Sequence, residues 1–105
     1  MLDLIAKLMR MNSETRNLDN ELVNSEVNYI SSTLELMRDA QQISNDAYLD
    51  SGSIQGGLSV ISSLLEQGIS DSEIDSLLNT LFERAKILNS KYPKLNKLIE
   101  SYRNN

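Results

Sequence analysis

The side chains that could carry acid–base chemistry in this sequence are carboxylates, because the chain of 105 residues contains neither His nor Cys. Asp71 and Asp75 are a candidate pair, since they stand one helical turn apart. Catalysis by such a pair needs a concave, partly desolvated site that shifts the pKa of one carboxyl. Both residues fall instead in the first turns of a predicted helix, where exposed acids are favourable. We therefore predict a solvated helix face, no catalytic residues and no enzymatic activity.

Oxygen-rich loop chemistry is the second candidate, around the glycines in the middle of the chain. Asp46, Asp50 and Ser51 precede the glycine-containing segment 52–57, which could suggest a cation loop. The ligand spacing of an EF-hand is missing, however, and so is the Gly-Lys-Ser/Thr ending of a phosphate loop. Without Cys or His the chain also lacks soft metal ligands. We predict no metal, no cofactor and no small-molecule substrate.

Basic side chains gather near the C-terminal end, together with Tyr92 and Tyr102. Beyond position 83 a single acid, Glu100, faces six bases: Arg84, Lys86, Lys91, Lys94, Lys97 and Arg103. The composition resembles a small nucleic-acid patch, but the formal charge of −5 for the whole chain argues against nucleic acid as a partner. The first fifty residues hold nine acids and four bases. We expect the basic end to meet these acids, within the chain or on a partner subunit.

The first half of the chain shows helical periodicity, because its apolar residues recur at steps of three and four. This pattern allows one long helix over about residues 3–47. A break near residues 11–14 is the alternative, since Asn12 or Ser13 could cap a new helix. We predict a long helix after that point and leave open whether the first ten residues continue it. A continuous helix would extend roughly 65 Å, whereas a compact globule of this length has a radius of about 13 Å.

A helix that overhangs its own domain needs cover, and a second copy of the chain can supply it. We therefore predict a homo-oligomer that associates through the long helix, in the manner of a coiled coil. The predicted interface consists of the apolar residues along the middle of that helix: Leu18, Leu22, Val23, Val27, Ile30, Leu34 and Met37.

The second half of the chain is predicted to form shorter helices. Turn-forming residues predict a hinge at about 48–57, and helices follow at about 57–67, 71–91 and 93–103. The clearest boundary lies between the first two of these helices, where Gly68 can end one helix and Ser70 with Glu73 forms a capping box for the next.

Together these elements predict an all-α fold. We expect a single helical domain over residues 1–105, built as an antiparallel bundle with one long N-terminal helix and two to three shorter C-terminal helices. The predicted core includes six residues from both halves of the chain: Ile30, Leu34, Met37, Leu78, Leu81 and Phe82.

The function that these features favour is protein binding by a regulatory, adaptor, inhibitor or chaperone-like module. The N-terminal residues lack the pattern of a secretory signal, and no apolar stretch is long enough to span a membrane, which predicts a cytoplasmic protein. Enrichment in Asn, Ser, Ile and Leu is consistent with a bacterial or phage origin.

Two alternatives belong to other classes of protein. A helical-hairpin partner of type VII secretion has a similar length and a glycine-containing turn at mid-chain, but the Trp-X-Gly turn and the C-terminal Tyr-x-x-x-Asp/Glu signal are missing here. A bacteriocin-immunity bundle is similar in size and helicity, but those proteins tend to be basic and this chain is acidic.

Overall fold

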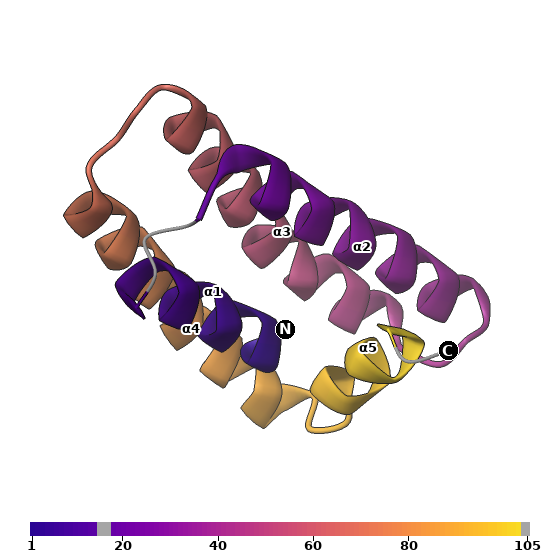
Figure 1. Ribbon diagram of the computed structural model, residues 1–105. Helices are drawn as coiled ribbons and strands as arrows, with labels where there is room; N and C mark the ends of the chain where they lie inside the picture. Colours follow the sequence, from indigo (N-terminus) through magenta and orange to yellow (C-terminus); the bar gives the residue numbers. More distant parts are fainter. Residues whose placement is uncertain (15–17, 104–105) are drawn as a thin grey trace.

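The computed structural model describes residues 1–14 and 18–103, and this part of the chain is built from helices (Figure 1). Five follow in sequence: α1 (Leu2–Glu14), α2 (Asn20–Asp39), α3 (Asn45–Glu66), α4 (Asp71–Lys91) and α5 (Leu95–Arg103). No strand occurs within these two described ranges. The predicted all-α class is confirmed.

The four longer helices pack as two pairs. α2 lies along α3 and α1 lies along α4, and contacts between α3 and α4 join the pairs (Figure 1). The short α5 packs against α2 and follows directly on the end of α4. The molecule measures 40 × 24 × 21 Å along its principal axes. Each of these helices is therefore covered by another helix of the same chain.

The long helix predicted in the first half of the chain is wrong. The described residues of 3–47 contain α1, α2 and the first residues of α3. α2 begins after Asp19, whose carboxylate accepts a hydrogen bond from the backbone N–H of Leu22 at 2.8 Å. The alternative break near residues 11–14 is closer, because α1 ends at Glu14, but Asp19 caps the next helix in place of Asn12 or Ser13. Apolar spacing runs on across both helix ends, so periodicity alone could not locate them.

The hinge predicted at about 48–57 is wrong as well, because these residues lie inside α3. Ser44 starts this helix, since its hydroxyl accepts a hydrogen bond from the N–H of Ala47 at 3.0 Å. Burial of Ile54 and Leu58 against neighbouring helices offsets the low helix propensity of the glycines. The helix predicted at 57–67 is the second half of α3.

The turns after α2 and α3 share one geometry. In each, a residue with positive φ follows the helix, and its N–H and that of the next residue bond back to the last carbonyls. Gly68 takes this position after α3 with a φ of 83°, as the sequence predicted. Gln41 takes it after α2 with a φ of 59°, although its side chain disfavours this conformation. The α2–α3 turn is therefore built on a strained residue.

The remaining predicted boundaries are close to those observed. α4 spans the residues expected, and Ser70 caps it by accepting a hydrogen bond from the N–H of Glu73 at 3.3 Å. Pro93 lies just after α4, and α5 begins two residues later at Leu95.

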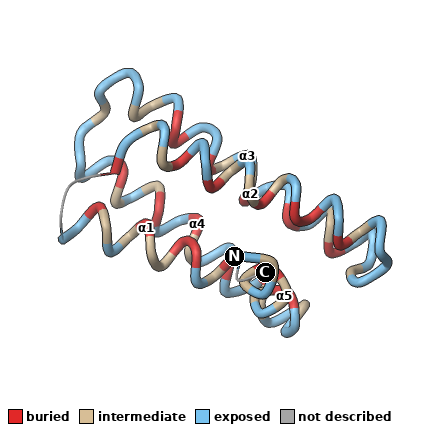
Figure 2. Tube along the Cα trace, turned by 45° about the vertical axis from the view of Figure 1, so that its right-hand side comes forward, coloured by how far each residue is buried: buried red, intermediate tan, exposed pale blue. Residues whose placement is uncertain are grey.

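The buried apolar residues of all five helices form one cluster, and they lie mainly on the sides of the helices that face one another (Figure 2). Five of the six predicted core residues are buried in it and the sixth is half-buried: Ile30, Leu34, Met37, Leu78 and Leu81, with Phe82.

Gly57 has a packing role that two other glycines of α3 lack. A β-carbon at Gly57 would lie 2.4 Å from Cδ2 of the buried Leu81 on α4. Gly52 and Gly56 face open space on the same helix. The close approach of α3 to α4 therefore depends on Gly57 alone among these three residues.

We expect Gly57→Ala to lower the free energy of unfolding by about 1–2 kcal/mol, because overpacking against Leu81 outweighs the gain in helix propensity. Gly52→Ala and Gly56→Ala are the matched controls, and each should raise stability by up to about 1 kcal/mol. Urea unfolding of the three variants measures the difference. Equal stabilisation by all three substitutions would mean that α3 and α4 accommodate the added methyl group at position 57 without a loss of stability.

A buried carboxylate links three helices. Glu26 on α2 is 5% exposed, and it accepts hydrogen bonds from Arg103 on α5 at 2.7 Å and from Lys7 on α1 at 3.1 Å. The Arg103 guanidinium also stacks on the Tyr29 ring, 4.1 Å from its centroid, and the Tyr29 hydroxyl donates to the carbonyl of Ile99. These contacts fix α5 against α2.

The pKa of Glu26 lies below its ordinary value of 4.5. Burial alone would raise this pKa, but the hydrogen bonds from Arg103 and Lys7 favour the ionised form and outweigh burial. Because the folded pKa is lower than the unfolded one, the stability that Glu26 contributes is complete above 4.5 and is lost as the pH falls through the folded pKa.

We expect Glu26→Gln to lower the free energy of unfolding by about 1–3 kcal/mol at neutral pH, since it leaves Arg103 without its carboxylate. The difference from the parent should shrink as the pH falls below 4.5, where the parent loses the same interaction. Glu35→Gln, at an exposed position of α2, is the control and should change stability little. A deficit that does not depend on pH would contradict the assignment.

Candidate protein-binding groove

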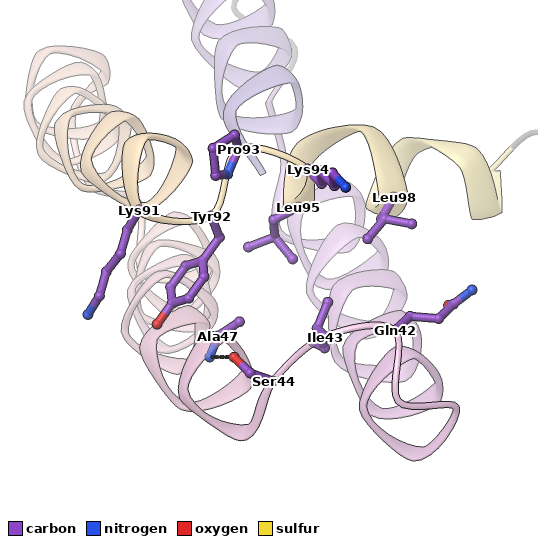
Figure 3. A pocket seen from close by; sticks show the side chains of 10 residues that line it. All are labelled: Gln42, Ile43, Ser44, Ala47, Lys91, Tyr92, Pro93, Lys94, Leu95 and Leu98. Carbon is purple, nitrogen blue, oxygen red and sulfur yellow. Dashed lines mark hydrogen bonds between the residues drawn. The ribbon is translucent and has the colours of Figure 1, made fainter.

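An apolar hollow of the surface lies where the α2–α3 turn faces the junction of α4 and α5 (Figure 3). It has a volume of about 330 Å³. Its lining comes from two segments of the chain: Gln42, Ile43, Ser44 and Ala47 on one side, and Lys91, Tyr92, Pro93, Lys94, Leu95 and Leu98 on the other.

The backbone on both sides is set by local sequence. Pro93 cannot continue α4, and Tyr92 before it takes a non-helical conformation with φ −130° and ψ 77°. The chain therefore turns away and starts α5 at Leu95. On the other side the left-handed Gln41 turns the chain, and the Ser44 cap starts α3. The two turns therefore set the positions of the residues that form the sides of the groove.

The floor of the groove is apolar. Leu95 is almost fully buried beneath it, and Ile43 and Leu98 are half-buried. Figure 3 shows these side chains directed into the space between the two segments, with the Tyr92 ring at one side. An apolar side chain of a ligand could therefore be removed from water here.

A tyrosine hydroxyl bridges the two walls at each end of the groove. At one end, Asp50 Oδ2 on α3 accepts hydrogen bonds from the Tyr92 hydroxyl at 2.7 Å and from Lys91 Nζ at 2.8 Å. At the other end, the Tyr102 hydroxyl on α5 donates to Oε1 of Gln42. The two bridges hold the α4–α5 segment at a fixed position relative to the α2–α3 turn.

The charges at the first bridge favour the ionised carboxylate. Hydrogen bonds from Lys91 and Tyr92 hold the pKa of Asp50 below its ordinary value, and the same contacts with Asp50 raise the pKa of both partners. A general acid or base needs a pKa near the working pH. The pKa of Asp50 is instead shifted further from neutral pH, so this cluster is suited to a structural role.

Lysines stand around the groove. A second hollow of about 440 Å³ adjoins the first, because both are lined by Pro93, Lys94 and Leu98, and it extends along α5 to Lys97 and Ser101. Lys94 and Lys97 are exposed. Among residues 1–14 and 18–103, the charged side chains that line the two hollows are Lys91, Lys94 and Lys97, with no Asp or Glu.

The carboxylate pair considered from the sequence lies elsewhere. Asp75 on α4 accepts a hydrogen bond from Nδ2 of the buried Asn12 on α1 at 2.6 Å, and the carbonyl of Asp71 accepts from the same nitrogen at 3.4 Å. These contacts tie α1 to α4. Within residues 1–14 and 18–103, no group of three or more acidic side chains is placed to hold a metal ion.

The seven residues predicted as an oligomer interface face the inside of the fold. Five are buried and two are half-buried against the same core: Leu18, Val23, Ile30, Leu34 and Met37, with Leu22 and Val27. Helices of the same chain cover them, and the overhanging helix that motivated self-association is absent.

The expected attraction between the basic end and the acidic first half is present within the chain. Lys91 pairs with Asp50 at 2.8 Å, and Arg103 pairs with Glu26 at 2.7 Å. Lys94 and Lys97 do not take part in the ion pairs formed among the described residues. The sequence singled out these lysines and both tyrosines, but it gave no sign that residues 42–47 would lie opposite them.

Comparisons of the chain with protein-family models, with curated proteins and with solved structures found no match. None of the helices in the described ranges combines the length and the apolar character needed to cross a membrane.

We expect Tyr102→Phe to loosen α5 selectively, because it removes the bridge to Gln42. Amide hydrogen exchange in α5 should speed up about three- to tenfold, in line with a loss of roughly 0.5–1.5 kcal/mol for one hydrogen bond. Exchange in the α1–α4 pair should stay unchanged. Tyr48→Phe is a control on α3, and faster exchange throughout the chain would show a global effect instead.

Proposed function

We propose that this protein is a non-enzymatic protein-binding module whose binding site is the groove between the α2–α3 turn and the α4–α5 junction. What supports the proposal is an apolar floor of Ile43, Leu95 and Leu98 that is open to solvent between two fixed walls. A ligand group that fills this floor gains the free energy of apolar burial without reorganising the walls.

A partner protein is favoured over a reaction substrate by the chemistry of the lining. The groove contains no His or Cys, and the carboxylate of Asp50 at one end is engaged by Lys91 and Tyr92. Hydroxyl, amide and ammonium groups at the margin can orient a bound segment. They do not form a nucleophile with an adjacent base.

The proposed partner is a different protein. Self-association was expected because an overhanging helix would need a second copy of the chain to cover it. In the compact fold, helices of the same chain already cover the predicted interface residues. Regulatory, adaptor, inhibitor and chaperone-like roles all use such a site.

Photo-cross-linking tests the proposal. A photoreactive amino acid replacing Lys94 at the groove should give a defined cross-linked species in cells that naturally make the protein. The same amino acid replacing Ser63, an exposed residue of α3, is the matched control and should not give that species.

Leu98→Ala in the cross-linker variant should weaken the product, because it removes part of the groove floor. Circular dichroism establishes that this variant is folded. Identical products from positions 94 and 63, or a product made only of two copies of this chain, would contradict the proposal.

A further inference from the structure

We infer that the groove selects a protein segment in which an apolar side chain is flanked by several carboxylates. This inference rests on the proposed function and names the chemistry of the partner. The observation behind it is that three lysines and no acid line the two adjoining hollows, on a chain whose net charge is −5.

Two of the three lysines at the groove keep an uncompensated charge. Asp50 pairs with Lys91 at 2.8 Å and also accepts a hydrogen bond from Tyr92, and Glu100 on α5 is paired with Arg103 at 3.3 Å. Lys94 and Lys97 have no ion-pair partner among the described residues, so their charge is presented to solvent. Carboxylates of a ligand are the groups that complement it.

The other cations outside the ion pairs of the described residues lie away from the groove. Arg10 and Arg84 are both exposed and outside these ion pairs. Neither of them lines the two adjoining hollows, although Arg84 lines two smaller hollows between α3 and α4. Lys94 lines both hollows of the groove and Lys97 lines the second, so the groove brings two unpaired lysines to one apolar floor.

The arrangement fits a polypeptide better than a small amphipathic anion. Lys91, Lys94 and Lys97 are three residues apart in the chain and follow the groove from the end of α4 into α5. A single headgroup neutralises one such position, whereas acidic residues spaced along a segment can meet two or three. An amphipathic helix with apolar anchors and acidic neighbours has this character.

Selection from a random peptide display library on the immobilised protein tests the inference. Peptides recovered with the parent chain should be enriched in Asp and Glu beside Leu, Ile or Phe, relative to the starting library. Their affinity, measured by fluorescence anisotropy, should fall about tenfold or more for the Lys94→Glu/Lys97→Glu variant, and it should fall as salt is raised.

Arg10→Glu/Arg84→Glu is the matched control, because it makes the same change in net charge outside the groove. Affinity for the acidic peptides should then fall much less, since only the long-range field differs. Both double variants alter exposed positions, and circular dichroism with thermal melting establishes that they are folded.

The other outcomes separate this inference from the proposed function. Recovery of apolar peptides without acid enrichment, with binding lost in Leu98→Ala, would keep the groove as a protein-binding site and overturn its selectivity for acids. Recovery of no peptide that depends on Leu98 would overturn both. Equal losses of affinity in the two double variants would overturn the inference. Binding of decanoate in the groove, together with no enrichment of acidic peptides, would also overturn it and would assign the groove to a small amphipathic anion.

Discussion

The ion pair between Glu26 and Arg103 is the contact on which the rest of the functional surface depends. α5 has only nine residues and packs mainly against α2, so its apolar side chains alone give it a small contact area. The buried carboxylate of Glu26 holds Arg103, and Lys7 brings α1 to the same point. Because α5 supplies Leu95 and Leu98, this network also sets the wall of the groove. Glu26 does not line the groove, but its buried carboxylate helps to fix the position of the helix that does.

The sequence predicted the second half of the chain better than the first, for a physical reason. The boundary at Ser70 carries several independent signals, and a glycine that ends one helix precedes an N-cap with an acid three residues later. The α2–α3 turn lacks the glycine, because Gln41 occupies a left-handed position that normally favours that residue. Asp19 and Ser44 do cap helices, but a single polar residue within a periodic pattern is a weak signal.

The middle glycines misled the sequence analysis because glycine has two opposite uses. It ends helices where φ is positive, as at Gly68, and it lets helices approach closely, as at Gly57 against Leu81. Only the neighbouring helix distinguishes the two. The candidate groove shows the same limit: its lysines and tyrosines were visible as a cluster, but Ile43 and Ala47 join them through tertiary folding that no local pattern encodes.

The bridge of Asp50 with Lys91 and Tyr92 also determines which changes in its surroundings the groove can sense. The pKa of Asp50 is lowered and those of Lys91 and Tyr92 are raised, so the pKa values of all three groups lie further from neutral pH than their ordinary values. With no histidine in the chain, the protonation of this bridge is constant over the range of pH found in cells. Attraction to the exposed lysines, by contrast, is screened over about 10 Å at ordinary salt concentrations. A ligand held by these charges would therefore be released by a rise in ionic strength.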